Sequence, residues 1–337
     1  MKQERFVERH QAEWREFELW LERRGDSARN ARSTRREWRG IRDDELPARH
    51  RRLCQQLALA RRRGYSAVVT DRLQQLMQRG HSMLYRTKPA HPRRAVEFLL
   101  AGFPRLVRAE WRCMLAAALL FVIPLVTIFV AIQVKPDLAS GLFPPQMLAQ
   151  FEEMYDPSGK RDLGRTNEDD LEMFAHYIGN NVGIGFQTFA TGLVAGVGTV
   201  FVLIFNGIMI GGVAGHLQAV GHGDPFWRFV AGHSAPELTA IVIAGGAGLR
   251  MGLSLIAPGQ RRRVDSLIHG GRRGAKICIG VFAMLVFAAF VEAFWSSIGW
   301  MPASIKYAVG ALLWSLTALW LLRGGRNAAY QDDEDAA

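Results

Sequence analysis

The first apolar run along the chain predicts a helix that crosses a membrane. Residues Met114–Val134 hold 21 positions without a charged side chain. About 20 such residues form an α-helix long enough for a hydrocarbon core of roughly 30 Å. A soluble alternative would need a helix of this length buried on every side, which a chain of 337 residues rarely provides. The pattern therefore indicates an integral membrane protein.

Further apolar runs predict about six spans in all. Ile178–Val220 contains no Asp, Glu, Lys or Arg over 43 residues, which is enough for two crossings that turn near residues 196–198. The predicted spans lie near residues 114–134, 178–197, 199–220, 235–257, 277–298 and 304–322. A rival interpretation has four full spans, with either 178–197 or 226–257 lying as an interfacial or re-entrant element.

Before the first span, apolar residues recur at helical spacing in an arginine-rich segment. The first predicted helix ends at Gly25 and carries one apolar stripe: Phe6, Val7, His10, Trp14, Phe17 and Leu21. A second helix should begin after Pro47 and stop at Gly64, and a third should follow Ser66. We therefore predict an all-α protein, in which a polytopic membrane helix bundle is preceded by a cytoplasmic helical bundle.

The charges divide the chain into domains and orient it. Residues 1–113 contain 27 Lys and Arg against 14 Asp and Glu, and the connection 258–276 is also basic. Residues 135–175 instead hold nine acidic and four basic side chains. Because basic segments stay in the cytoplasm, both basic segments and both termini are expected there, with the acidic loop outside. The predicted domains are a basic arm over 1–112, a transmembrane domain over 113–323 and an acidic tail over 324–337.

Three explanations compete for the basic arm: nucleic-acid binding, attraction to anionic lipid, and determination of topology. Acidic residues are interspersed through the arm, as on a solvated helix face. Lipid proximity and orientation explain the charge without a further ligand, so we expect membrane lipids as partners and no nucleic acid. The N-terminus has no apolar segment typical of a signal peptide, and Cys54, Cys113 and Cys278 are not expected to form disulfides.

Small residues repeat every fourth position in two of the predicted spans. The repeats are Gly207, Gly211 and Gly215, followed by Ala240, Ala244, Gly248 and Gly252. Small residues at this spacing let helix backbones approach closely in lipid. The repeats could pack inside the bundle or form an oligomer contact. We favour internal packing and leave a homo-oligomer open.

Polar residues within the apolar segments are the candidate functional groups, because such groups are costly in a membrane and usually have partners. They are Asn180, Asn181, Gln187, Asn206, His233, Glu237, Arg250 and Glu292. Glu237 and Arg250 lie thirteen residues apart, about 20 Å along one helix, and so cannot pair with each other. We expect Arg250 to reach toward the nearer membrane face.

His233 and Glu237 are one helical turn apart, but their context does not predict catalysis. The zinc-protease signature is His-Glu-x-x-His, whereas this segment reads His-Ser-Ala-Pro-Glu. We expect a structural contact of His233 with Glu237 or Asn206, and we predict no catalytic residue, metal ligand or cofactor site.

The same polar and glycine residues resemble the stage II sporulation protein M family. The resemblance rests on Asn180-Asn181, Asn206-Gly207, Gly211-Gly212 and the segment from His233 through Glu237 to Arg250, and on arm segments 46–65 and 73–85. It implies a multi-pass protein of the bacterial inner membrane that organises envelope-remodelling partners and performs no chemistry itself. Relatives in bacteria that do not sporulate often lie beside genes for AAA-type ATPases, so the resemblance also implies such an ATPase as a partner.

Two functions follow as expectations. The first is a non-enzymatic membrane scaffold or assembly partner in envelope remodelling. The second is a permease-like subunit of a transporter that works with a separate ATPase, with Asn206, His233 and Glu237 lining a path.

Overall fold

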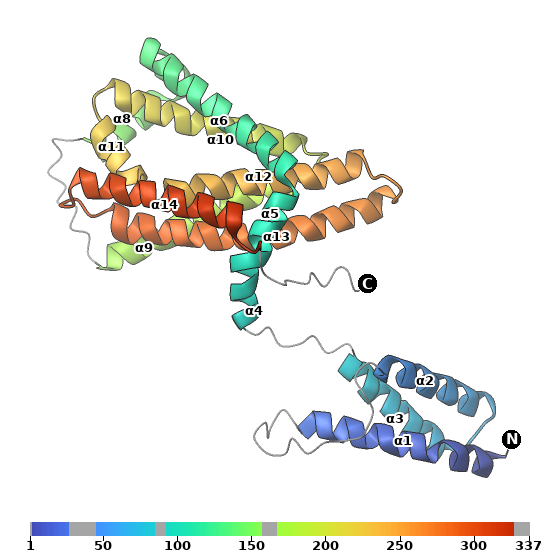
Figure 1. The fold of residues 1–337 in the computed structure, drawn as a ribbon. Coiled ribbons are helices and arrows are strands. Elements are labelled where there is room, and N and C mark those ends of the chain that lie inside the picture. The colour runs from blue at the N-terminus through green and yellow to red at the C-terminus, as the bar shows by residue number, and fades with distance from the viewer. Residues whose placement is uncertain (1, 27–44, 85–91, 157–166, 327–337) are drawn as a thin grey trace. The chain divides into compact units, whose positions relative to one another are not determined.

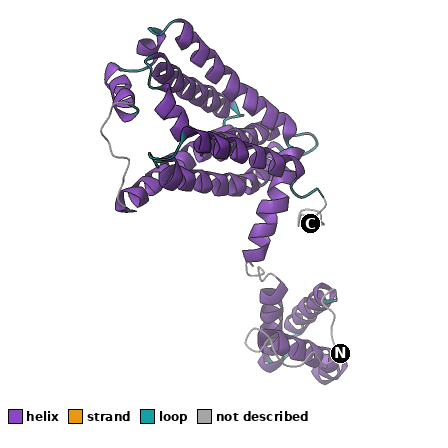
Figure 2. Cartoon of the chain, turned by 60° about the vertical axis from the view of Figure 1, so that its left-hand side comes forward, coloured by secondary structure: helices purple, strands orange, loops and turns teal. Residues whose placement is uncertain are grey.

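The computed structural model describes residues 2–26, 45–84, 92–156 and 167–326, and within these ranges it contains helices and turns but no strand. The chain divides into two compact units, residues 1–90 and 91–337 (Figure 1). The helical content, seen throughout both units in Figure 2, confirms the predicted fold class.

In the part of the N-terminal unit that the structure describes, three helices form: α1 (Gln3–Asp26), α2 (Leu46–Arg62) and α3 (Ala67–Leu84). Gly64 ends the α2 helix with a positive φ of 63°, a conformation that glycine adopts without strain. The apolar stripes of the three helices meet in one core, whose largest buried members are Phe6, Trp14, Phe17, Trp20, Leu21, Leu46, Leu53, Leu57, Leu73 and Leu76. This unit therefore has a hydrophobic core of its own.

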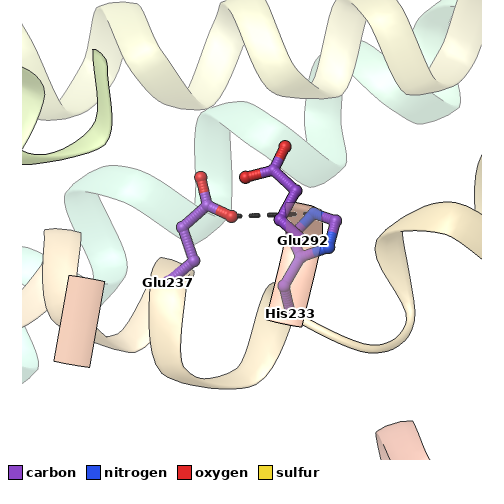
Figure 3. A group of neighbouring side chains, drawn as sticks. All are labelled: His233, Glu237 and Glu292. Atoms are coloured by element: carbon purple, nitrogen blue, oxygen red, sulfur yellow. Dashed lines mark ion pairs between the residues drawn. The ribbon is translucent and has the colours of Figure 1, made fainter. Parts of the chain in front are cut away.

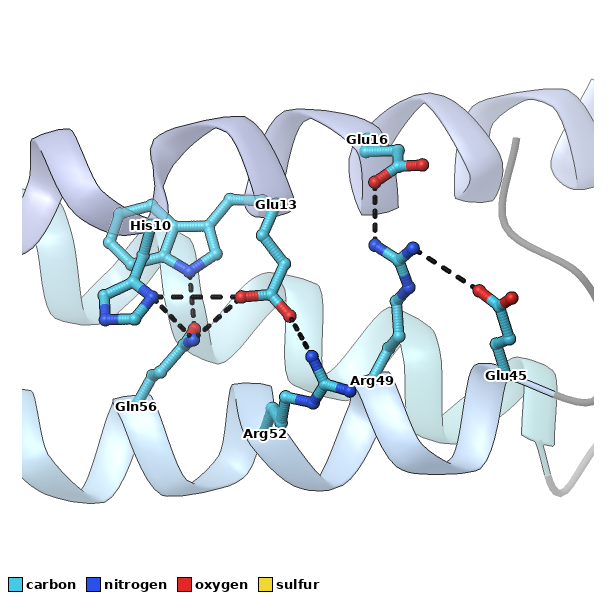
Figure 4. A network of polar contacts seen from close by, with 8 residues as sticks. His10, Glu13, Glu16, Glu45, Arg49, Arg52 and Gln56 are labelled. Atoms are coloured by element: carbon cyan, nitrogen blue, oxygen red, sulfur yellow. Dashed lines mark hydrogen bonds and ion pairs between the residues drawn. The ribbon is translucent and has the colours of Figure 1, made fainter. Parts of the chain in front are cut away.

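A polar network joins α1 to α2 beside that core (Figure 4). The indole of Trp14 donates to Gln56 Oε1 at 2.6 Å, and the Gln56 amide donates in turn to Glu13 at 3.1 Å. Arg49 bridges Glu16 at 2.7 Å and Glu45 at 3.4 Å. These contacts satisfy the buried indole and fix the register of α1 against α2.

Six long helices make up most of the membrane unit over residues 92–156 and 167–326. They are α6 (Trp111–Val134), α9 (Asn167–Ala190), α10 (Val197–Ala219), α12 (Ser234–Ile256), α13 (Arg263–Val291) and α14 (Ala303–Arg323). By length and composition, all but α9 are long and apolar enough to cross a membrane. The less apolar α9 packs along α12 and α13, so it belongs to the same bundle.

Shorter elements complete the unit at the two ends of the bundle. The end that we call the α5 end holds α4 (Pro92–Glu97), a π-helical turn (Phe98–Gly102), α5 (Phe103–Ala109), the α9–α10 turn and the α12–α13 connection. The opposite end, called the α8 end, holds α7 (Leu138–Leu142), α8 (Pro145–Met154), α11 (Gly223–Val230) and the connection from α13 to α14 (Figure 1).

Three boundaries differ from those expected. The predicted span 178–197 corresponds to the second half of α9 and the turn after it, because α9 begins at Asn167 and ends at Ala190. The α13 helix begins at Arg263, so most of the predicted basic loop 258–276 is helical and extends a span instead of connecting two. Residues 98–109, which we assigned to the basic arm, pack against the membrane bundle: Phe103 contacts the core of α13, and Arg108 donates to the carbonyl of Gly324 at 2.6 Å. Their apolar side chains find burial there, which the charge count did not reveal. The preceding α4 is exposed along its whole length.

The repeated glycines lie where helix backbones come closest. A Cβ on Gly207 would collide with the carbonyl oxygen of Phe121, and a Cβ on Gly211 with that of Leu125. This repeat therefore lies directly against α6. On α12, Gly248 lies against the Thr188 carbonyl, and Gly252 against the backbone of Gly196. In both repeats these residues face other helices of the same chain.

Substitution of Gly211 by leucine should therefore destabilise the bundle. The new side chain would meet the α6 backbone, which cannot move aside cheaply, and overpacking of this kind costs about 1–3 kcal/mol or more. Gly183→Leu on α9 is the matched control, because a Cβ there meets nothing within 4 Å. Thermal unfolding in detergent should show a lower midpoint for Gly211→Leu alone, and equal midpoints for the two variants would contradict this packing.

Candidate functional site

Polar side chains from the start of α12 and the end of α13 meet near the α8 end of the bundle. His233 directly precedes α12, and Glu237 lies in the first turn of that helix. Glu292 begins a π-helical turn, Glu292–Ser296, at the end of α13. The nitrogen and oxygen donor atoms of His233, Glu237 and Glu292 all lie within 4.8 Å of one another (Figure 3). We refer to these three residues as the His-Glu-Glu cluster.

The local sequence explains how α12 positions its two members of the cluster. Pro236 lacks a backbone N–H and is suited to the first helical turn, where N–H groups have no partner within the helix. Glu237 follows in that turn, where the helix dipole favours a negative charge. The four-residue spacing then places its carboxylate one turn above the imidazole, with His233 Nε2 and Glu237 Oε2 3.7 Å apart.

Hydrogen bonds from the surrounding helices hold the cluster in place. His233 Nδ1 lies 3.0 Å from the hydroxyl of Ser296, so this contact orients the ring and turns Nε2 toward Glu237. The amide of Asn181 on α9 donates to Glu292 at 3.4 Å. Lys306 on α14 donates to the backbone carbonyl of Ser296 at 2.8 Å. Four helices therefore contribute to the site.

The cluster is removed from water on most sides. His233 is 4 % exposed, Glu292 is 8 % exposed and Asn181 is 3 % exposed. The side chain of Glu237 keeps 19 % of its surface accessible, which leaves one open side. Two carboxyl groups this close and this poorly hydrated cannot both carry a full negative charge without a proton or a cation nearby.

The other sequence candidates lie outside the cluster. Asn206 on α10 donates to the carbonyl of Val202 in its own helix at 2.8 Å, so the expected alternative of a contact with His233 is not formed. Asn180 is exposed and donates to Asn181 at 3.0 Å. The expectation for Glu237 was a contact with His233, and the two side chains do face each other. Glu292 was noticed in the sequence only as a carboxylate within an apolar run.

A second polar site at the α5 end was missed by the sequence analysis. The carboxylate of Glu110 pairs with Arg250 of α12 at 3.1 Å and with Arg273 of α13 at 2.8 Å. Arg250 therefore reaches a charged partner rather than only the membrane face. Nearby, burial and the charges of Arg326 and Arg105 lower the pKa of Arg108. The signal was present in the sequence, because Glu110 is the one acidic residue among the arginines just before the first span.

The fold and these buried polar sites together define a polytopic, all-helical membrane protein. Comparison with protein families finds that the model described as stage II sporulation protein M matches residues 116–297. The match covers more than half of the chain, and the protein therefore belongs to the stage II sporulation protein M family. All three residues of the His-Glu-Glu cluster lie within the matched region.

The N-terminal unit matches a different family. A domain of unknown function, DUF8413, covers residues 4–86, which correspond to α1, α2 and α3. Comparison with curated proteins and with solved structures gives no match.

Removal of the Glu110 charge should destabilise the bundle more than removal of an exposed charge. Glu110→Gln would leave Arg250 and Arg273 without their common counter-ion, and breaking a buried ion pair costs about 3 kcal/mol or more. Because the two arginines keep 29 % and 26 % of their side-chain surface exposed, we expect the lower end of that range.

The matched control is Arg262→Gln, which breaks an ion pair at the surface. The side chain of Arg262 is 93 % exposed and that of its partner Asp265 is 61 % exposed. An exposed pair contributes about 0–1 kcal/mol. Thermal unfolding of both variants in detergent measures the difference, and a Glu110→Gln midpoint equal to that of the control would show that the double ion pair is not important for stability.

Proposed function

We propose that this protein is a non-enzymatic scaffold of the bacterial inner membrane that assembles partner proteins for envelope remodelling. The observation that carries the proposal is the N-terminal unit, which closes its own core of Trp14, Phe17 and neighbouring residues without help from the membrane bundle. A small separate helical unit attached to a membrane bundle is suited to recruiting a soluble partner. An AAA-type ATPase is the partner that the family resemblance favours.

The tight packing of the membrane unit supports the same role. Backbone-to-backbone contacts at Gly207, Gly211 and Gly252 join α6, α10 and α12 closely. Interiors packed in this way resist continuous deformation. A platform that holds partners at fixed positions needs this rigidity.

The recruitment proposal is tested by removing the N-terminal unit. A chain lacking residues 2–84 should insert in the membrane and keep the melting temperature of the bundle, but it should lose the ATPase from complexes cross-linked in native membranes. The control chain lacks residues 327–337, the other terminal segment, and should keep the ATPase. Quantitative mass spectrometry of both complexes gives the result, and equal recovery of the ATPase from the two chains would contradict the proposal.

We infer further that the α5 end faces the cytoplasm and the α8 end faces the periplasm. The α5 end carries Arg112, Arg272, Lys276 and Arg323, whereas α8 contributes Glu152 and Glu153 to the opposite end. Since basic residues remain on the cytoplasmic side, the charges favour this orientation. Both termini lie inside when α9 counts as a sixth crossing beside the five helices that are long and apolar enough to span the membrane.

Cysteine labelling tests this orientation. In a background without Cys54, Cys113 and Cys278, the variant Val220→Cys places an exposed thiol after α10, and Val264→Cys places one at the start of α13. A membrane-impermeant maleimide should label the first in intact spheroplasts and the second only after lysis. Protection of Val220→Cys until lysis would instead favour the four-span arrangement, and labelling of Val264→Cys before lysis would reverse the orientation.

The permease-like alternative has one specific observation in its favour, the buried His-Glu-Glu cluster. Buried ionisable groups in membrane proteins often mark ion or substrate pathways. However, Asn206, the third residue of the expected path, bonds to its own helix. The experiment is reconstitution of this protein with its partner ATPase in lipid vesicles. ATP-dependent uptake of a solute by such vesicles would favour the transporter over the scaffold.

A further inference from the structure

We propose that the His-Glu-Glu cluster binds a divalent first-row transition metal, such as Zn²⁺ or Mn²⁺, and that this ion joins α12 to the end of α13. The cluster supplies one imidazole nitrogen and two carboxylate groups from His233, Glu237 and Glu292. Imidazole with carboxylate suits such metals, whereas Ca²⁺ and Mg²⁺ prefer oxygen ligands alone. The proposal goes beyond the scaffold function and does not depend on it.

The distances fit a single ion. Two ligands of one metal with bonds of about 2.0–2.2 Å lie roughly 3 to 4.3 Å apart. His233 Nε2 and Glu237 Oε2 are separated by 3.7 Å, too far for a hydrogen bond but within this interval. All donor atoms of the cluster lie within 4.8 Å of one another, so side-chain shifts of about 0.5 Å bring every pair into this interval.

The outer contacts are those that metal ligands commonly have. A ligating histidine usually engages its second ring nitrogen in a hydrogen bond, which fixes the ring and directs the first nitrogen at the metal. Ser296 engages His233 Nδ1 at 3.0 Å in this manner. Ligating carboxylates are also hydrogen-bonded, and Asn181 donates to Glu292 at 3.4 Å.

Charge balance also favours a cation. Glu237 and Glu292 approach each other in a largely buried site, and the ammonium of Lys306 is directed to the carbonyl of Ser296. A divalent ion would neutralise both carboxylates and leave the cluster without net charge. The exposed side of Glu237 gives the ion a way in and leaves room for water as a further ligand.

The location indicates what the ion would do. Glu237 lies in the first turn of α12, Glu292 opens the π-helical turn of α13, and Asn181 belongs to α9. An ion held by the first two residues would cross-link their helices at one membrane end. Metal binding would therefore stabilise this end of the bundle, because the ligands come together only in the folded protein and the bound ion favours that state.

The test measures metal binding by the full-length protein in detergent, purified without a histidine tag and stripped with a chelator. Titration with Zn²⁺ or Mn²⁺ should give one bound ion per chain and a higher melting temperature, and Ca²⁺ or Mg²⁺ should not reproduce the effect. These measurements use the unmodified protein and need no variant to fold. The proposal would be overturned if the metal-free protein bound neither metal, or if its melting temperature changed with pH but not with added metal. Either result would instead indicate that the two carboxyl groups share a proton.

Variants then assign the bound metal to the cluster. Glu292→Gln and His233→Asn should each lower the affinity by more than a hundredfold, since each removes a ligand. Ser296→Ala keeps all three ligands and should lower the affinity by about 10–100-fold through the outer contact. Unchanged affinity in Glu292→Gln and His233→Asn would place the ion elsewhere and refute the assignment.

His216→Gln is the matched control. His216 pairs with Glu152 at 2.8 Å near the same end of the bundle, so it is a second His–Glu contact that offers only two ligands. This variant should bind the metal like the parent. If it loses the ion while the cluster variants retain it, the metal belongs to that pair and the proposal is wrong.

Discussion

The structure of the membrane unit depends on one constraint: a polar or charged group placed away from water must find its partner within the protein. The α12 helix illustrates this at both ends. His233 and Glu237 meet Glu292 at one end, and Arg250 meets Glu110 at the other. Between these two sites the helix is apolar and rich in small residues. Its position along the bundle axis is therefore fixed by polar contacts that would be lost if it moved by a single turn.

Close packing of backbones supplies the second restraint on the same helix. Gly248 and Gly252 bring α12 against the end of α9 and the turn before α10, where Gly196 adopts a positive φ of 82°. Since lipid tails are as apolar as leucine, large side chains gain little by leaving lipid, and helix association depends on such close contacts. The polar sites set the register, and the glycines set the distance.

The sequence predicted the helices well because their signals are local. Apolar runs of a length matched to the bilayer located five helices that can span it, whereas the predicted span 178–197 covers only the second half of the less apolar α9 and the turn after it. The Phe6, Trp14 and Phe17 stripe located the core of the N-terminal unit. The candidate site was predicted less completely. The neighbours His233 and Glu237 could be paired by helical spacing, but Glu292 is 55 positions further along the chain than Glu237. Only the packing of α13 on α12 brings it near, and no periodicity in one chain encodes that contact.

The boundary of the basic arm was misplaced for a related reason. Charge composition assigns residues 92–109 to the cytoplasmic arm because their four arginines outnumber the one glutamate, yet Phe103 and Leu106 are buried against α13. Composition reports the average environment of a segment, whereas packing depends on a few large side chains within it. Residues 98–109 are the part of the arm that packs on the membrane bundle, so they hold the chain where it enters the first span.

The restraints on α12 also bear on the choice between a scaffold and a transporter. Alternating access requires one group of helices to move against another around a central site. Here α12 contacts α6, α9, α13 and α14, and its charged contacts at both ends would have to break in such a motion. An ion at the His-Glu-Glu cluster would add a further cross-link between α12 and α13. A bundle held in this way is better suited to keeping bound partners at fixed positions than to changing its own conformation.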